Sequence, residues 1–94
     1  MRSVKTYSNI FVIGSAKMSN QVVAYVLVTT EVGKEHEVVQ ELLEIEGIIL
    51  AQTVYGEFDV ICKVECSNLK SLDASITKIR KIQSLIRTMT LIAG

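Results

Sequence analysis

The sequence predicts an α+β protein in which a four-stranded antiparallel sheet carries two helices on one face. Three observations predict it: an apolar run over residues 21–29, two stretches with helical spacing that begin near residues 35 and 69, and two β-branched runs between them that meet at a glycine turn. An alternating run over residues 85–93 completes the order βαββαβ. Since crossovers between strands are right-handed, this order most simply gives a ferredoxin-like sheet of strand order 4-1-3-2.

Length and composition indicate one domain that associates with a partner. The 94 residues are 49% hydrophobic and include no proline, and the mean hydropathy is +0.37. A chain this short buries a modest fraction of its surface, so part of the apolar area is expected to lie against another subunit. Residues 21–94 form the predicted domain. Residues 1–20 are either an N-terminal arm that docks through residues 10–13 or an upstream extension, with Met18 as the alternative start.

Charge and cysteine content argue against several classes of protein. Ten basic residues balance ten acidic ones and the isoelectric point is about 6.6, so the chain lacks the excess of cations that DNA or RNA binding demands. Cys62 and Cys66 lie roughly 13 Å apart on one predicted strand, which is too far for a disulfide and fits a reducing, cytoplasmic location. The apolar run at residues 10–13 is too short to cross a membrane or to act as a targeting signal.

Hydrophobic spacing defines the first strand and the first helix. Residues 21–29 are apolar at nearly every position, as expected of a central strand that is covered on both sides. After a loop at residues 30–34, glutamates mark the positive end and the exposed face of a helix that ends at Gly47. The apolar stripe of this helix consists of Val38, Val39, Leu42, Leu43 and Ile45.

The two β-branched runs are predicted to pair through a two-residue type II′ turn at Gly56 and Glu57, in which the glycine adopts a positive φ. This turn sets a register that places Thr53 opposite Val60 and sends alternate side chains to opposite faces. The side chains predicted to face the helices are Ile49, Ala51, Tyr55, Phe58, Val60 and Cys62. The other side, called the open face below, is the predicted dimer interface and carries Ile48, Leu50, Gln52, Val54, Asp59, Ile61, Lys63 and Glu65.

The second helix and the last strand complete the domain. Ser67 or Asn68 is expected to cap a helix whose outer face is basic, which indicates a solvated surface favoured by the helix dipole and not a nucleic-acid site. The last strand places the hydroxyl groups of Thr88 and Thr90 on one side. The apolar stripe of the helix is Leu69, Leu72, Ile76 and Ile79.

A search for catalytic groups finds little. The single histidine, His36, falls in the first turn of a helix among charged neighbours, where a solvated side chain is expected. No serine or cysteine has a base at a suitable spacing, no metal-ligand pattern occurs, and the sequence contains no glycine-rich phosphate loop. We therefore expect no enzymatic activity, no catalytic or metal-ligating residue and no cofactor.

The hairpin and the last strand carry the groups best suited to bind a small molecule. The backbone N–H of Gly56 suits an α-carboxylate and the carboxylate of Asp59 suits an α-ammonium, while Tyr55, Thr88 and Thr90 are further candidate contacts. The predicted ligand is thus an amino acid. The alternative is structural: Gly56 makes the turn, and Asp59 hydrogen-bonds to its backbone, a common role of aspartate at hairpin ends.

The same residues resemble a known family. The hairpin segment 56–59, which follows an aliphatic strand, resembles that of the ligand-binding (RAM) domain of Lrp/AsnC transcription regulators. The resemblance covers residues 22–94, and it implies dimers that pack sheet against sheet and join into larger assemblies with an amino-acid effector bound between dimers. It rests further on Gly33, residues 42–48, Leu85, Arg87, Thr88 and Thr90.

The resemblance also has a limit. Full-length members carry a helix-turn-helix domain for DNA, whereas residues 1–20 alone precede the first predicted strand here, so the sequence resembles a stand-alone form of the domain. Its implied role is to sense an amino acid, or to assemble with a full-length relative and change that relative's response without binding DNA itself. Two alternatives stay open: an ACT-type regulatory module of an amino-acid metabolic enzyme, and a dimeric α/β-barrel enzyme.

Overall fold

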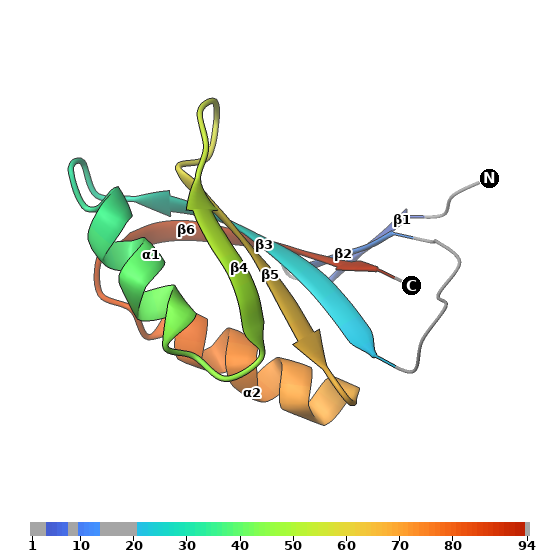
Figure 1. Cartoon of the computed structure of the whole chain (residues 1–94). Coiled ribbons are helices and arrows are strands. Elements are labelled where there is room, and N and C mark those ends of the chain that lie inside the picture. Colours follow the sequence, from blue (N-terminus) through green and yellow to red (C-terminus); the bar gives the residue numbers. More distant parts are fainter. Residues whose placement is uncertain (1–3, 8–9, 14–20, 94) are drawn as a thin grey trace.

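The computed structural model describes residues 4–7, 10–13 and 21–93 of the chain. Over these ranges the chain forms a six-stranded sheet and two helices, and both helices lie on the same side of the sheet (Figure 1). The elements in chain order are β1 Val4–Tyr7, β2 Ile10–Ile13, β3 Val22–Thr30, α1 Glu35–Leu43, β4 Ile48–Thr53, β5 Val60–Cys66, α2 Leu69–Arg80 and β6 Leu85–Ala93.

The sheet has the strand order β1-β2-β6-β3-β5-β4. Its strands β6-β3-β5-β4 are antiparallel and correspond to the predicted order 4-1-3-2, so the predicted βαββαβ fold is confirmed. β3 is central, as predicted, since it pairs with both β5 and β6. The inner part of the predicted hairpin register is confirmed as well, because Thr53 lies opposite Val60 and Ala51 lies opposite Cys62.

β1 and β2 form an antiparallel hairpin that the sequence analysis does not predict. β2 pairs in parallel with β6, with Ile10 opposite Thr90 and Ile13 opposite Ala93. The hairpin therefore adds two strands to the β6 edge of the predicted four-stranded sheet. β2 coincides with residues 10–13, the segment through which the predicted N-terminal arm was expected to dock. Met18, the alternative start, lies outside the described residues, and the boundary at residue 20 stays a prediction.

Local signals determine where the helices begin and end. Asn68 caps α2: its Oδ1 accepts a hydrogen bond from the backbone N–H of Ser71 at 2.8 Å, which satisfies one of the free donors of the first turn. Lys78 and Arg80 lie in the last turn of α2, where the helix dipole favours cations. Neither helix of the described ranges is long and apolar enough to cross a membrane.

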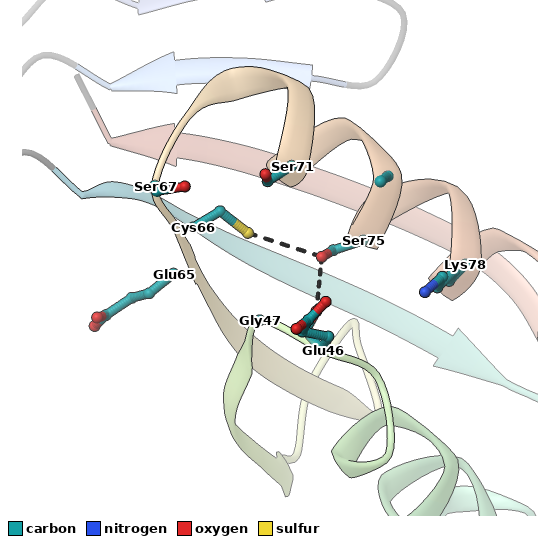
Figure 2. A pocket seen from close by; sticks show the side chains of 9 residues that line it. Glu46, Gly47, Glu65, Cys66, Ser67, Ser71, Ser75 and Lys78 are labelled. Atoms are coloured by element: carbon teal, nitrogen blue, oxygen red, sulfur yellow. Dashed lines mark hydrogen bonds between the residues drawn. The ribbon is translucent and has the colours of Figure 1, made fainter.

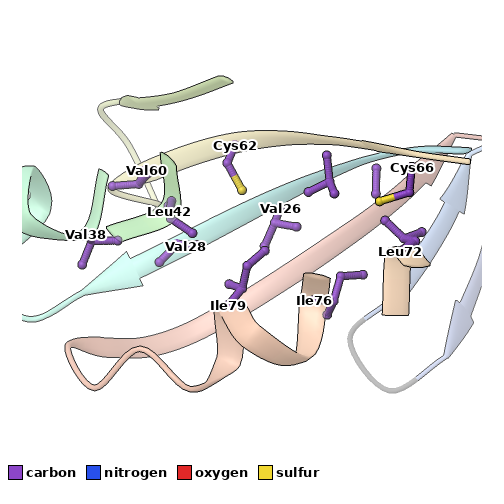
Figure 3. Close-up of a cluster of buried hydrophobic side chains, with 12 residues drawn as sticks. Val26, Val28, Val38, Leu42, Val60, Cys62, Cys66, Leu72, Ile76 and Ile79 are labelled. Carbon is purple, nitrogen blue, oxygen red and sulfur yellow. The ribbon is translucent and has the colours of Figure 1, made fainter. Parts of the chain in front are cut away.

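The hydrophobic core lies between the two helices and one face of the sheet (Figure 3). Alternate residues of β3 and β5 point into it, and it is closed by α1 and α2. Both cysteines belong to it as free thiols, which confirms that they serve as small buried hydrophobic groups. Its members in the described chain are Ala24, Val26, Val28, Val38, Leu42, Val60, Cys62, Val64, Cys66, Leu72, Ile76 and Ile79.

β4 departs from the prediction at both ends. A bulge between Ile48 and Leu50 shifts the register, so Ile48 lies opposite Val64 and packs against the core, and its predicted place on the open face is wrong. Ile49 in turn has 55% of its surface exposed. The prediction that Ile49 packs under the helices is therefore wrong. The same prediction for Tyr55 is wrong too, because the regular pairing of β4 with β5 ends before this residue and its side chain is fully exposed.

The apolar stripes and the central strand differ from the prediction in smaller ways. Leu43 and Leu69 are exposed, because each is the terminal residue of its helix and lies beyond the last core contact. In β3, residues that face the helices are buried, whereas the alternate residues are half-buried. The cover expected on the second side of this strand is thus not supplied by the described part of the chain.

Candidate functional site

The loop between β4 and β5, residues 54–59, protrudes beyond the sheet (Figure 1). It continues the hairpin by one hydrogen bond, from the N–H of Val54 to the carbonyl oxygen of Asp59 at 2.9 Å. Gly56 has a φ of +126°, so the expected positive φ is confirmed, and a Cβ built at this position meets no atom within 4 Å. Backbone conformation, and not lack of space, is therefore what favours glycine here.

Asp59 joins the loop to the end of the central strand. Its N–H donates to the carbonyl oxygen of Val28 at 2.8 Å, and its Oδ2 accepts the backbone N–H of Thr30 at 2.9 Å. The carboxylate thus bonds to a backbone group that lies 29 residues away in the sequence, and not to the turn that contains it. A carboxylate has acceptor sites on both oxygens, so this single bond leaves capacity for another donor.

A small cavity of about 270 Å³ lies beside Asp59. Its walls come from the end of β4, from the protruding loop and from the first turn of α1, and its lining residues are Glu35, His36, Thr53, Val54, Tyr55 and Asp59. The cavity therefore places two carboxylates and an imidazole around one space. His36 is exposed, as the sequence suggests, yet it also faces this space together with Asp59.

The predicted site residues lie in two separate places. Tyr55 and Asp59 line the cavity, and Gly56 is the next residue along the same loop. Thr88 and Thr90 lie in β6 opposite Val28 and Val26, whose side chains face the core. Thr88 is half-buried and Thr90 is only 1% exposed, and neither belongs to the lining of the cavity.

Sequence reasoning missed three contributors to this region. Glu35 and His36 reach the cavity because the start of α1 packs beside the loop, and no local pattern of sequence reports that proximity. Arg87 holds the loop from the other side: its Nη2 lies 3.2 Å from Oε2 of Glu57, and its guanidinium lies 5.0 Å from the ring centre of Phe58. The sequence alone does not show that Arg87 of β6 reaches this loop, because its partners Glu57 and Phe58 lie about thirty residues earlier in the chain.

A second cavity, of about 380 Å³, lies at the opposite end of the β4–β5 pair (Figure 2). There the hydroxyl of Ser75 donates to the carbonyl oxygen of Glu46 at 2.7 Å, and the Sγ of Cys66 lies 3.8 Å from the same hydroxyl (Figure 2). Ser75 is buried, and its hydrogen-bonding capacity is used to join α2 to the turn before β4. This cavity therefore adjoins a structural contact between α2 and the turn before β4.

The open face of the sheet combines apolar side chains with locally neutralised charges. Leu27 lies between Ile61 on β5 and Met89 on β6, and all three are half-buried in the single chain. Lys63 Nζ lies 3.3 Å from Oε2 of Glu65 and 5.8 Å from the ring centre of Tyr25 (a residue that adjoins it in the ladder). Such a face has the composition of a contact surface.

The described residues offer no activated nucleophile or metal centre. Burial raises the pKa of Cys62 from 9.0 to about 12, and a hydrogen bond with the backbone of Val26 lowers it by less. The thiol therefore stays protonated near neutral pH and is inert. Nowhere in the described ranges do three or more His, Cys, Asp or Glu residues gather in a way that could hold a metal ion.

The model of the Lrp/AsnC ligand binding domain family matches residues 23–93. The chain belongs to this family. The match includes both helices, the four antiparallel strands and the protruding loop with Asp59, whereas β1 and β2 lie before it. Domains of this family belong to proteins of the transcription-regulator type.

Solved structures agree with this assignment. The chain is 47% identical to the hypothetical protein PHS023 from Pyrococcus horikoshii, with a TM-score of 0.74 over 78% of this chain and 89% of that one. It is also 47% identical to FFRP-DM1, with a TM-score of 0.73 over 78% of this chain and 99% of that one. E. coli AsnC, at 20% identity and a TM-score of 0.69, shares the fold, and the match covers 57% of its length. Among curated proteins no match was found.

Proposed function

We propose that this chain is an amino-acid-sensing oligomeric domain that acts on transcription through partner regulators of the Lrp/AsnC type. The observation that carries the proposal is the cavity beside Asp59 in a domain of a ligand-binding family. Its volume of about 270 Å³ lies just below the range of roughly 300–1,000 Å³ for small-molecule sites, so it suits only a small ligand such as an amino acid.

The lining of the cavity supports a ligand with an ammonium group. Asp59 and Glu35 supply carboxylates, and each already accepts one backbone N–H, from Thr30 and Gly33 respectively. In our proposal Asp59 accepts the α-ammonium and the backbone N–H of Gly56 donates to the α-carboxylate. Tyr55 covers the ligand. Thr88 and Thr90 stay predicted further contacts, although neither lines this cavity.

The oligomer in this proposal forms through the open face. Leu27, Ile61 and Met89 remain half-buried in the single chain, and a partner sheet would complete their burial. The cavity beside Asp59 lies at the surface of the subunit, where a neighbouring dimer could close it, and we propose that the effector binds there between dimers of the larger assembly. Light scattering at micromolar concentration tests this part, and a monomer would contradict it.

The proposed regulation takes place without contact to DNA. The chain carries as many acidic as basic residues, and the counterion release that drives DNA binding needs an excess of cations. An effect on transcription would then require assembly with a regulator that binds DNA, and the two buried free thiols suit the reducing conditions of the cytoplasm. We propose no catalytic activity for the chain itself.

A thermal-shift screen of the full chain against the twenty amino acids tests the sensing function. A ligand at 100 times its dissociation constant adds about 2.7 kcal/mol to the stability of the native state, which is easily seen as a higher melting temperature. We expect one amino acid or a small chemical group of them to raise the melting temperature. No shift with any of the twenty at millimolar concentration would contradict amino-acid sensing.

A further inference from the structure

The cavity beside Asp59 carries more negative charge than a single α-ammonium group needs. Its lining includes the carboxylates of Glu35 and Asp59, and no lysine or arginine is among the described residues that line it. The other polar side chains of its walls are those of His36, Thr53 and Tyr55, and none of these is a permanent cation. In the proposed function Asp59 accepts the α-ammonium, so the charge of Glu35 is left without a counterpart.

The two carboxylates have no cationic partner within the part of the chain that the structure describes. Ion pairs over these residues involve other acidic groups. Lys34 directly precedes Glu35 in the sequence, yet its Nζ lies 3.1 Å from Oε2 of Glu37, which is not part of the cavity. Glu35 and Asp59 therefore remain available to cations of a bound molecule.

Backbone hydrogen bonds position the two carboxylates from different elements of the fold. Oε1 of Glu35, in the first turn of α1, accepts the N–H of Gly33 at 3.3 Å. Oδ2 of Asp59, in the protruding loop, accepts the N–H of Thr30 at 2.9 Å. Because a carboxylate has two acceptor oxygens, each group keeps an oxygen that can bind a cation. The cavity thus offers two anchored negative charges on different walls.

We propose that the effector is an amino acid with a basic side chain, such as lysine, ornithine or arginine, and that Glu35 selects it. This inference rests on the proposed function, because it keeps the α-ammonium on Asp59 and adds a contact between the side-chain cation and Glu35. The methylene stem of the ligand lies along the aliphatic wall at Val54, as long basic side chains do on apolar surfaces. The aromatic ring of Tyr55 covers the cation.

Other classes of ligand satisfy this cavity less well. An acidic side chain would bring a third negative charge beside Glu35, and like charges at close range repel. An apolar side chain would remove water from the Glu35 carboxylate without supplying a partner, which costs free energy. A diamine would satisfy both carboxylates, but it has no carboxylate to accept the N–H of Gly56. A basic amino acid is the class that satisfies all three groups.

Calorimetry of the full chain with lysine and with norleucine tests the proposal. These amino acids have the same four-carbon stem and differ only in the terminal ammonium group. We expect lysine to bind at least about tenfold more tightly, which is the ratio expected of one charge-assisted hydrogen bond. Norleucine that binds as tightly as lysine would overturn selection by charge and leave amino-acid sensing intact.

Cadaverine is lysine without its α-carboxylate, so it separates a basic amino acid from a simple diamine. It should bind more weakly than lysine, because it cannot accept the N–H of Gly56. Cadaverine that binds as tightly as lysine would overturn the proposal in favour of a diamine site. Binding by neither lysine nor any other of the twenty amino acids would contradict the proposed function as well, so the two failures are distinguishable.

Glu35→Gln identifies the residue that selects the ligand. Glutamine keeps an oxygen that can accept the N–H of Gly33, so the start of α1 is preserved, and the preference for lysine over norleucine should fall to about one. Glu31→Gln is the matched control, since it removes the same charge from an exposed residue outside the cavity, and it should keep the preference. A preference that persists in Glu35→Gln, or that is lost equally in Glu31→Gln, would refute the role of Glu35.

Discussion

Each end of the β4–β5 pair contains a glycine with positive φ, but the two glycines have different surroundings. At the packed end, Gly47 has a φ of +98°, and a Cβ built there would lie 2.9 Å from Ser75 Oγ and 3.0 Å from Cys66 Sγ. At the free end, Gly56 has a φ of +126° and no atom within 4 Å of that position. The first end is a contact between turn, strand and α2, whereas the second is a protruding loop.

Because of this difference, the polar groups at the packed end stabilise the fold, whereas those at the free end remain available to bind a ligand. The packed end uses its polar groups internally, as the bond from Ser75 to the carbonyl oxygen of Glu46 shows. The free end exposes Tyr55 completely and leaves the Asp59 carboxylate with acceptor capacity beside a cavity. A residue that matters for stability is therefore expected at the packed end, and a residue that matters for ligand binding at the free end.

The largest effect is expected for Gly47→Val. A β-branched residue at positive φ is strained, and its side chain would collide with Ser75 and Cys66, so the variant should lose at least about 3 kcal/mol of unfolding free energy. Urea denaturation followed by circular dichroism measures this. Gly56→Val is the matched control, since it carries the strain alone and should lose about 1–3 kcal/mol. Equal losses in the two variants would remove the distinction between the ends.

Asp59→Asn is expected to act on ligand affinity more than on stability. Asparagine keeps the size and an oxygen that can still accept the N–H of Thr30, but it removes the charge that an ammonium requires. Affinity for the amino acid found in the screen should fall by about 1.5–3 kcal/mol, which is about tenfold to a hundredfold.

Calorimetry on Asp59→Asn and Asp59→Ala distinguishes the two roles of this residue. The alanine variant also loses the bond to Thr30, so it alone should lower the melting temperature of the unliganded protein by a measurable amount. If the asparagine variant lowers the melting temperature while its amino-acid affinity equals that of the wild type, then Asp59 is a structural residue only.

A smaller effect is expected for Arg87→Ala. The ion pair with Glu57 is exposed and the stacking on Phe58 lies at the surface, so the loss of unfolding free energy should stay at or below about 1 kcal/mol. Chemical denaturation measures it, with Arg87→Lys as a control that keeps the charge and loses the planar group. A loss above about 3 kcal/mol would mean that the free end is packed as firmly as the other end.

Ionisation of the Cys62 thiol is expected to have no effect on the free energy of unfolding below about pH 9. Its pKa rises from 9.0 to about 12 on folding, so the thiol ionises first in the unfolded chain, and stability falls only as the pH rises from 9 towards 12. Iodoacetamide at pH 8 should therefore leave Cys62 unmodified in the native protein and modify it in urea, as read by mass spectrometry. Rapid modification of the native protein would show that the core opens easily.

Much of the fold could be predicted because each element carries its own signal. The alternating run at residues 85–93 coincides with β6, and the cap at Asn68 marks a helix start that local chemistry decides. The predicted stop at Gly47 is wrong by four residues, because α1 ends at Leu43 with Glu44 as its C-cap, and Gly47 lies in the turn before β4. The strand order followed from the handedness of crossovers. In contrast, the bulge that turns Ile49 outward has no marker in the sequence, because it depends on how β4 fits against β5.

The candidate site was predicted only in part, for a similar reason. Tyr55, Gly56 and Asp59 are neighbours in the chain, so a turn signal could find them together. Glu35 and His36 come to the same cavity from α1, and Thr30 reaches the Asp59 carboxylate from β3. Contacts between residues more than twenty positions apart leave no local pattern when a single sequence is read.

The sequence by itself determined the order of elements, their approximate ends, the central place of β3 and the positive φ at Gly56, because spacing, capping and turn preferences are short-range effects. The tertiary structure alone decided which side of β4 faces the helices at Ile49, that the N-terminal hairpin joins β6 in parallel, and that Glu35 of α1 and Asp59 of the protruding loop line one cavity. These features depend on packing between distant segments, whose energies are set by complementary shape and charge and not by any run of neighbouring residues.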